Sequence, residues 1–281
     1  MRFVGTVILY NPDFVLLERI NSYLPFVEQL YVIDNSEVQN KNLIDQILAV
    51  NKIIYIWNGM NLGIAEALNI ALNMAEHNNA DFILTMDQDS SFSVESISLY
   101  FNAIQSFKDI NSIGIFAPNY NYHGVPSGKN FSDEHLVITS GSLINLKASK
   151  NIGNFDNNLF IDEVDHDYSL RAIQLGYRVI MFKEIGLIHK LGNQADKINL
   201  FGKTIKIMGH SPLQNYYQLR NVLYMRKKHG LTFNKITRSR LKSVKKHIRR
   251  NILYGDHKLE RIKFVIFAIK DYLIIWVNSI K

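Results

Sequence analysis

The chain has 281 residues, of which 47% are hydrophobic and 20% charged, and its mean hydropathy is −0.05. These values are ordinary for a globular protein with one large domain, or one domain with an appendage, and they exclude a disordered chain. The absence of cysteine excludes disulfide bonds, a thiolate nucleophile and cysteine metal ligands. The net charge of +7 is uneven, because residues 226–263 hold fourteen Lys or Arg against two acids while the rest of the sequence carries −5.

The first half of the sequence alternates short apolar runs with segments of helical periodicity. The run at residues 2–10 has no small-residue cleavage site, so it predicts a first strand rather than a signal peptide. No run reaches the roughly 18 uncharged apolar residues that would span a bilayer. Strands are predicted at residues 2–10, 30–34, 52–57, 81–86 and 113–117, and helices at residues 13–22, 39–49, 62–77 and 93–107.

This alternation predicts an α/β fold with a mostly parallel sheet that helices cover on both faces. Such sheets bind ligands beyond the carboxyl ends of their strands. The polar clusters of the first half each follow a predicted strand, so we expect them to meet at one edge of the sheet. They lie at residues 10–12, 34–36, 58–63 and 87–90.

The second half shows a less regular pattern. Residues 119–133 contain Gly, Asn and Ser and predict a loop of the kind that forms a flexible lid. Further strands are predicted at residues 135–146, 177–182 and 185–189, one helix at residues 162–175, and helical structure from residue 211 onward.

Two carboxylates, Asp87 and Asp89, stand two residues apart directly after the predicted strand at residues 81–86. Side chains at this spacing lie on the same side of an extended chain. Two carboxylates on one side suit Mg²⁺ or Mn²⁺, which such sites bind with few protein ligands and with substrate phosphates. The alternative is a solvated Asp-rich turn, because short motifs of this kind are common.

A second acidic cluster at residues 162–167 opens the predicted helix at residues 162–175. Carboxylates are favoured at helix N-termini, so capping is one interpretation, but four acids in six residues exceed what capping needs. A carboxylate here is also suited to take the proton of an attacking hydroxyl. His189 ends the predicted strand at residues 185–189 and is either a structural histidine or a third ligand beside the Asp pair.

Taken in order, these motifs resemble inverting glycosyltransferases of the GT-A fold, family 2 type. The resemblance covers roughly residues 2–225 and is strongest to the bacterial rhamnosyltransferases that build cell-surface polysaccharides, with galactofuranosyltransferases as relatives. The motifs that carry it are the first strand, the turn at residues 32–36, the segment 61–69, Asp87-Gln88-Asp89, Thr139-Ser140-Gly141, the block at residues 162–171 and the pair His189 and Gly192.

The resemblance implies binding roles for several matching residues. Relatives often carry a basic residue at the position of Gln214, so Arg220 becomes the better candidate for the donor phosphate. The expected donor-binding residues are Thr6, Tyr10, Asn11, Asp34, Asn61, Gly63 and Arg220. The expected acceptor-binding residues are Asp167, Ser140 and Gly141.

The resemblance also implies the catalytic and metal-binding residues. In relatives the general base precedes a helix arginine by six residues, and this position is Asp165 here. A metal-binding histidine follows about two dozen residues later, and His189 matches it. The implied cofactor is Mg²⁺ or Mn²⁺, held by Asp87, Asp89 and His189.

The basic C-terminal segment predicts two helices. Residues 237–253 place four apolar side chains on one face with Lys and Arg over the remainder, and residues 258–278 form an apolar, aromatic-bearing helix. Such a pair is typical of an anchor on an anionic membrane surface. The alternatives are packing of the apolar face on the catalytic domain, and nucleic-acid binding, which we do not expect because no recognised binding motif is present. The four apolar residues are Leu241, Val244, Ile248 and Ile252.

The sequence thus predicts a GT-A catalytic domain at residues 1–225 and a membrane-associating tail at residues 226–281. The expected reaction is metal-dependent, inverting transfer of L-rhamnose from dTDP-rhamnose to a lipid-linked oligosaccharide. We expect a cytoplasmic protein that is peripheral on the inner face of the cell membrane. The alternatives are another sugar, such as galactofuranose or a hexose from a UDP donor, and a non-enzymatic basic membrane-surface protein.

Overall fold

The computed structural model describes residues 1–189, 196–200, 203–207 and 209–278. The chain forms two compact units, each described here by itself. The sheet unit comprises Met1–Phe160 and Val164–Lys190, and the helical unit comprises Ile161–Glu163 and Leu191–Lys281. None of the helices in the described ranges combines the length and the apolar character that crossing a membrane requires.

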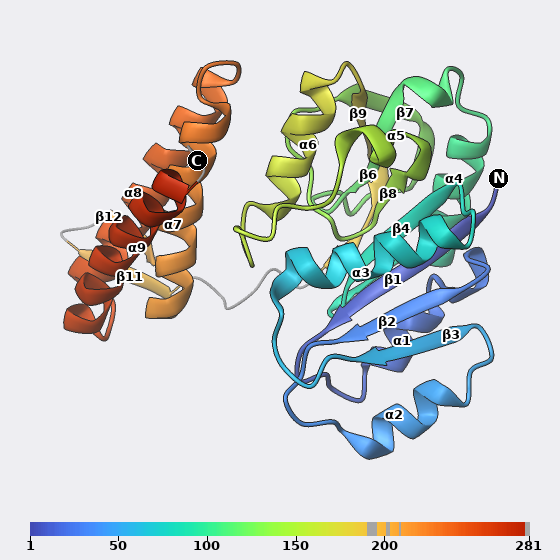
Figure 1. The fold of residues 1–281 in the computed structure, drawn as a ribbon, viewed down its shortest axis with the longest axis horizontal. Helices are drawn as coiled ribbons and strands as arrows, with labels where there is room; N and C mark the ends of the chain where they lie inside the picture. Colours follow the sequence, from blue (N-terminus) through green and yellow to red (C-terminus); the bar gives the residue numbers. More distant parts are fainter. Residues whose placement is uncertain (190–195, 201–202, 208, 279–281) are drawn as a thin grey trace. The chain divides into compact units, whose positions relative to one another are not determined.

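The sheet unit is built on one eight-stranded sheet (Figure 1). The strand order is β3-β2-β1-β4-β8-β6-β9-β7, and only β8 and β7 run antiparallel to their neighbours. The mostly parallel sheet is therefore confirmed. The strands are β1 (Phe3–Leu9), β2 (Leu30–Asp34), β3 (Ile53–Trp57), β4 (Phe82–Asp87), β6 (Ile113–Asn119), β7 (Ser127–Asp133), β8 (Ser142–Asn145) and β9 (Arg178–Gly186), and β5 (Ser90–Ser91) and β10 (Ile188–His189) form a separate short pair.

Helices cover both faces of this sheet because the pleat sends alternate apolar side chains to each face. On β1, Phe3, Val7 and Leu9 belong to a core that also includes buried side chains of α1, α2 and α4. Val4 and Ile8 are also buried but point to the opposite face, and α3 contacts β1, β2 and β4. The helices of this unit are α1 (Leu16–Asn21), α2 (Lys41–Leu48), α3 (Gly63–His77), α4 (Val94–Gln105), α5 (Leu146–Ile152) and α6 (Val164–Gln174), with short 3₁₀ turns at Leu24–Phe26 and Ile110–Ser112.

Several sequence-based boundaries in the second half are wrong. Residues 119–133, predicted as a loop, include the edge strand β7, which is mostly polar and keeps Phe131 packed on Phe107 and Phe182. Of the predicted strand at residues 135–146, only residues 142–145 form β8, and Leu146 already begins α5.

Two further boundaries differ from the prediction. The strands predicted at residues 177–182 and 185–189 are one strand, β9, followed by the short β10. The helix predicted from residue 162 begins at Val164. Asp162 and Glu163 have left-handed backbone angles (φ 68° and 63°), which a right-handed α-helix does not contain.

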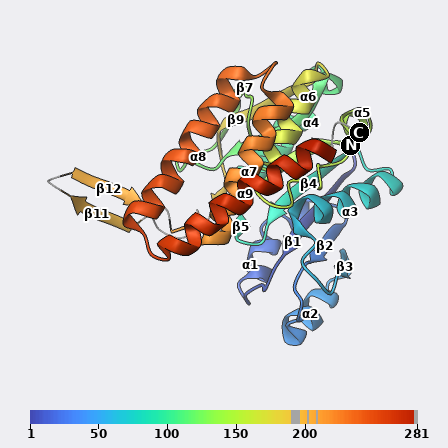
Figure 2. The same cartoon turned by 60° about the vertical axis from the view of Figure 1, so that its left-hand side comes forward.

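The described part of the helical unit contains three helices and an antiparallel pair of strands, and the sequence did not predict this strand pair (Figure 2). Val222, Val244, Ile248 and Ala268 are buried in its core, where α7, α8 and α9 contact one another. Of the apolar face expected on residues 237–253, Val244 and Ile248 are buried, and Leu241 and Ile252 are partly buried against this core. The elements are β11 (Asp196–Leu200), β12 (Lys203–Ile207), α7 (Pro212–His229), α8 (Asn234–Tyr254) and α9 (Lys258–Asn278).

Helix α9 keeps an exposed apolar stripe beside this core. Its members recur at helical spacing, and each exposes at least 44% of its surface. The exposed stripe consists of Ile262, Ile266, Ile269 and Leu273.

Candidate active site

The polar loops that follow β1, β2, β3 and β4 meet at one edge of the sheet, as the sequence predicts. Hydrogen bonds join them. The Asn35 amide nitrogen donates to the Gly63 carbonyl oxygen at 3.0 Å, and the Asn58 amide nitrogen donates to Asn35 Oδ1 at 2.8 Å. These hydrogen bonds therefore fix the loops of this edge relative to one another.

Gln88, between the two aspartates, fixes the turn after β4 to the loop after β1. Its Oε1 accepts from the Tyr10 backbone nitrogen at 2.8 Å, and its Nε2 donates to the Tyr10 carbonyl oxygen at 3.0 Å. The side chain of Tyr10 is 45% exposed, so this clip holds its backbone and leaves its ring accessible to a ligand. Sequence reasoning did not single out Gln88.

Asp87, Asp89 and His189 come together at the end of β4. One ligand atom from each lies within 4.8 Å of the others. The pairing of β10 with β5 brings His189 opposite Ser90, and His189 Nδ1 lies 3.4 Å from Asp89 Oδ1. Two carboxylates and one imidazole are donors that suit Mn²⁺ or Mg²⁺, so the residues fit the predicted ion. Gly192, the last residue of the histidine motif, lies outside the described residues.

Ser90 joins these ligands to the strand behind them, and sequence reasoning missed it. Its Oγ lies 2.7 Å from His189 Nδ1 and 3.4 Å from Asp89 Oδ1. It also accepts from Ser140 Oγ at 2.7 Å, while Ser140 Oγ accepts from the Asp87 backbone nitrogen at 3.2 Å. Because Nδ1 is the ring nitrogen near both Ser90 and Asp89, the contact with Ser90 fixes the orientation of the imidazole beside the aspartate pair, as outer contacts of metal-binding histidines do.

The acidic groups of the site repel one another. The pKa of Asp87 is raised to about 7, mainly by burial and also by the nearby negative charges of Asp89 and Asp165. Two other carboxylates within electrostatic range of Asp87 favour a bound cation, because a cation offsets the repulsion. Asp165 is therefore close enough to Asp87 for the two charges to interact.

Asp165 lies in the first turn of α6 and its side chain is 21% exposed. One carboxylate oxygen, Oδ1, accepts from the His166 backbone nitrogen at 2.8 Å. This bond fixes the orientation of the carboxylate, and its remaining lone pairs are suited to accept a proton from a hydroxyl.

The three residues before α6 are held by the helical unit, to which they belong. The Asn221 amide nitrogen donates to the carbonyl oxygens of Ile161 and Asp162 at 2.6 Å and 2.9 Å. The buried carboxylate of Glu163 pairs with Arg240 of α8, whose Nε lies 3.0 Å from Glu163 Oε1. Asp165 follows this segment after one residue, so the segment fixes the backbone that leads to it.

The residues predicted to bind the acceptor are placed as follows. Asp167 is fully buried and pairs with Arg171 at 2.8 Å, which secures α6. Ser140 is fully buried within the network around Ser90. Gly141 has φ +79°, and a Cβ there would lie 2.6 Å from Pro118. All three support the local structure, and contact with an acceptor stays a prediction.

Two of the residues predicted to bind the donor are fully buried. The Thr6 hydroxyl has no hydrogen-bond partner among the described residues. Asp34 accepts from the Tyr55 hydroxyl at 2.6 Å and from the Ser36 backbone nitrogen at 2.9 Å, so both of its oxygens already have a partner.

The other donor-binding candidates lie at the sheet edge or in the helical unit. Asn11 is exposed, and its backbone nitrogen donates to Ser36 Oγ at 2.8 Å. Asn61 Oδ1 accepts from the Gly63 backbone nitrogen at 2.9 Å, which shapes the start of α3. Arg220 belongs to the helical unit, where it lies over the Tyr217 ring at 4.9 Å. Their predicted ligand contacts stay predictions.

Comparison with known proteins identifies the family. The family model described as glycosyl transferase family 2 matches residues 7–168, which contain the end of β1, all of β2, β3 and β4, and the aspartate pair. The chain belongs to glycosyl transferase family 2. This family 2 chain is a glycosyltransferase, and membership in the family supports an enzyme over a non-enzymatic membrane-surface protein.

Relatives of this family 2 chain agree in sequence and in fold. It is 28% identical over 248 residues to the dTDP-rhamnosyl transferase RfbF of Shigella flexneri, covering 80% of each chain. TarS of S. aureus has the same fold with a TM-score of 0.61 at 17% identity, covering 97% of this chain and 48% of that one. GalNAc-T7, solved with UDP, GalNAc and Mn²⁺, gives a TM-score of 0.57 at 12% identity, covering 83% of this chain and 52% of that one. The family 2 chain spans about half the length of these two solved structures. These likenesses confirm the GT-A fold.

Proposed function

We propose that this glycosyltransferase transfers L-rhamnose from dTDP-rhamnose to a lipid-linked oligosaccharide in cell-surface polysaccharide synthesis, with a divalent metal and inversion at the anomeric carbon. The observation that carries the proposal is the convergence of Asp87, Asp89 and His189, with Asp165 in electrostatic range. The similarity to a dTDP-rhamnosyl transferase supports this donor. The alternative donor is a UDP-sugar, because a structure of TarS residues 1–349, which has a similar fold, contains UDP-GlcNAc.

In the proposed mechanism, Asp165 accepts the proton of the acceptor hydroxyl. The hydroxyl oxygen attacks the anomeric carbon from the face opposite the diphosphate, and the bond from that carbon to the diphosphate oxygen breaks. Held by Asp87, Asp89 and His189, Mg²⁺ or Mn²⁺ would neutralise charge on the departing diphosphate. The exposed Tyr10 and Asn11 would border the nucleotide at the same sheet edge.

Substitution of the base tests the reaction. Asp165→Asn should lose turnover by at least about a hundredfold, the usual contribution of a general base, and should still bind the donor nucleotide. The matched control is Asp167→Asn, which breaks a buried ion pair in the same helix and should lower stability more than it lowers turnover per folded molecule. Unchanged turnover in Asp165→Asn would overturn the base assignment.

Ligand-dependent thermal stabilisation tests the donor and the metal. A ligand that binds only the folded protein raises its stability by mass action. We expect dTDP and dTDP-rhamnose to raise Tm with Mn²⁺ and not with EDTA, and to do so more than UDP, GDP or UDP-galactofuranose. Stronger stabilisation by UDP species would change the assigned donor from dTDP-rhamnose to a UDP-sugar. No rise in Tm with any nucleotide would contradict the donor site.

The proposal places the catalytic region at residues 1–225 in the cytoplasm and the segment 226–281 on the inner face of the membrane. Helix α8 supports this because it carries eight Lys or Arg and no acid, and the exposed stripe of α9 supplies apolar side chains. Sedimentation with phosphatidylglycerol liposomes tests it. Ile266→Glu with Leu273→Glu should abolish binding, while Asp165→Asn should sediment like the unmodified protein; equal binding by all three would contradict the anchor.

A further inference from the structure

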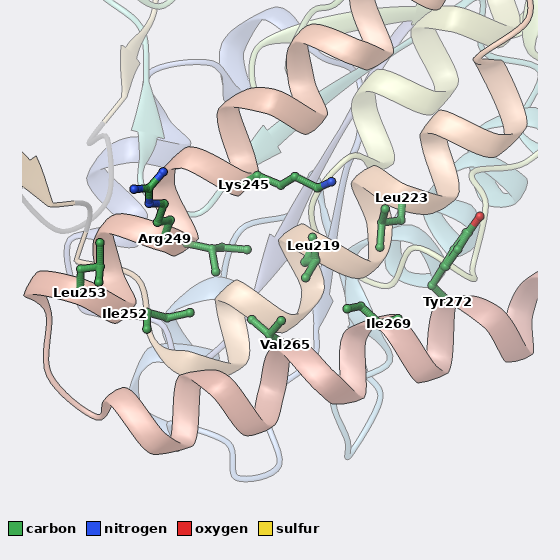
Figure 3. A pocket seen from close by; sticks show the side chains of 10 residues that line it. Leu219, Leu223, Lys245, Arg249, Ile252, Leu253, Val265, Ile269 and Tyr272 are labelled. Carbon is green, nitrogen blue, oxygen red and sulfur yellow. The ribbon is translucent and has the colours of Figure 1, made fainter.

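The helical unit contains an apolar pocket between α7, α8 and α9 (Figure 3). Its volume is about 590 Å³, which is within the range of small-molecule sites. Leu219 of α7, Ile252 of α8 and Val265 of α9 line it from three sides. The walls therefore come from all three helices of one unit, and they offer a ligand mainly hydrocarbon contacts.

The polar part of the lining is positively charged. Among the described residues that line the pocket, only Lys245, Arg249 and Tyr272 bring polar groups to it, and none is an acid. Lys245 and Arg249 are exposed and one turn apart on α8, and neither has an ion-pair partner within the described part of the chain. An apolar cavity beside two uncompensated cations is complementary to a molecule with a hydrocarbon chain and an anionic head.

The pocket also adjoins a route for such a molecule. Ile269 lines the pocket and is a member of the exposed stripe of α9, with 45% of its surface exposed. Apolar side chains are thus continuous from the exposed stripe of α9 to the interior of the pocket. A hydrocarbon chain that leaves a lipid layer at the exposed stripe would stay in apolar surroundings as it enters the pocket.

We propose that this pocket binds one hydrocarbon chain of a lipid phosphate, with the phosphate at Lys245 and Arg249. Resting on the proposed function, the inference identifies this lipid as the one that carries the acceptor saccharide. The pocket would hold the acceptor on the enzyme through its lipid, independently of the sugars that the catalytic site recognises.

Binding of farnesyl phosphate below its micelle concentration, followed by calorimetry and native mass spectrometry on the full chain, tests the proposal. We expect one farnesyl phosphate per chain, about tenfold weaker binding of farnesol, and no binding of inorganic phosphate. Ile269→Glu should weaken farnesyl phosphate about tenfold or more, because it places a carboxylate in the apolar wall. Its control is Ile274→Glu, on the same helix at 48% exposure and outside the lining, which should bind like the unmodified protein.

The charged contacts are tested in the same way. Lys245→Gln with Arg249→Gln should weaken farnesyl phosphate about tenfold, whereas Lys242→Gln with Lys246→Gln, which removes the same charge from α8 outside the lining, should change it less than about twofold. Equal loss of affinity in the two double variants would show that farnesyl phosphate is attracted to the positive charge of α8 in general, and would overturn the site. Unchanged binding in Ile269→Glu would do the same.

Two further outcomes would assign the pocket to another occupant. Displacement of farnesyl phosphate by short-chain phosphatidylglycerol at equal affinity would assign it to bulk membrane lipid. A dimer that farnesyl phosphate dissociates would assign it to a second copy of the chain. Thermal stabilisation by dTDP-rhamnose, measured on the same variants, separates this proposal from the proposed function, because donor binding can fail while lipid binding persists, and the reverse.

Discussion

Replacing Ser90 by alanine should weaken metal binding without touching a metal ligand. The Ser90 hydroxyl lies 2.7 Å from His189 Nδ1 and accepts from Ser140 Oγ at 2.7 Å, so its removal frees the imidazole to rotate and leaves a buried hydroxyl without its acceptor. Loss of such an outer contact lowers metal affinity about 10–100-fold, which is about 1.4–2.7 kcal/mol. The unpaired Ser140 should lower the free energy of unfolding by about 1–2 kcal/mol.

Calorimetric titration of Mn²⁺ in the presence of dTDP measures the first effect, and urea unfolding in EDTA measures the second. The control is Ser91→Ala, which removes the hydroxyl of the next residue, partly buried in the same strand β5. We expect Ser91→Ala to bind Mn²⁺ within about twofold of the unmodified protein, as a surface-type substitution should. Mn²⁺ affinity in Ser90→Ala within that same limit would refute the role of the serine network in holding His189.

Arg240→Gln should lower the free energy of unfolding by about 2–3 kcal/mol in urea, because it leaves the buried carboxylate of Glu163 without its 3.0 Å partner. Gly63→Ala should cost about 3 kcal/mol in the same assay, since φ is +83° and the new Cβ would lie 2.5 Å from the Phe160 ring. In EDTA, stability should fall as pH rises from about 4 to 7, by at most about 1.4 kcal/mol per pH unit, because the pKa of Asp87 is raised to about 7 and the fold therefore favours its protonated form. Asp87→Asn should remove that slope.

Each of these expectations has a result that would contradict it. Arg240→Gln within about 0.5 kcal/mol of the unmodified protein would show that solvent replaces the arginine. Gly63→Ala at full stability would show that the start of α3 adjusts to a side chain. If the free energy of unfolding of Asp87→Asn falls with pH as steeply as that of the unmodified protein, another titrating group causes the pH dependence.

The sheet was predictable where burial on both faces makes a strand uniformly apolar. β1, β2 and β4 are buried along almost their whole length, and their sequences are near-continuous apolar runs. β7 escaped prediction because it is an edge strand whose side chains are mostly exposed, so its sequence is as polar as a loop. The early start predicted for α6 has a similar cause, since Asp162 and Glu163 suit a helix N-terminus by composition and adopt left-handed angles instead.

The site was predictable where one motif or one resemblance names the residue. Asp87, Asp89 and His189 were expected and lie together. Ser90 carried no signal beyond its place after the aspartates, because a serine acts here through partners that only the β5–β10 pairing brings near. The ion pair of Glu163 and Arg240 spans 77 residues, and no local pattern connects two such distant charges.

The path of the chain has a consequence for recombining this protein with its relatives. Ile161–Glu163 belongs to the helical unit although the residues on both sides of it belong to the sheet unit. A truncation at residue 190 would remove Asn221 and Arg240 and leave this tripeptide without them, so loss of activity in such a fragment would not report on membrane anchoring. A chimera that takes its C-terminal helices from another family member should therefore take the matching tripeptide as well, as one module encoded in two places.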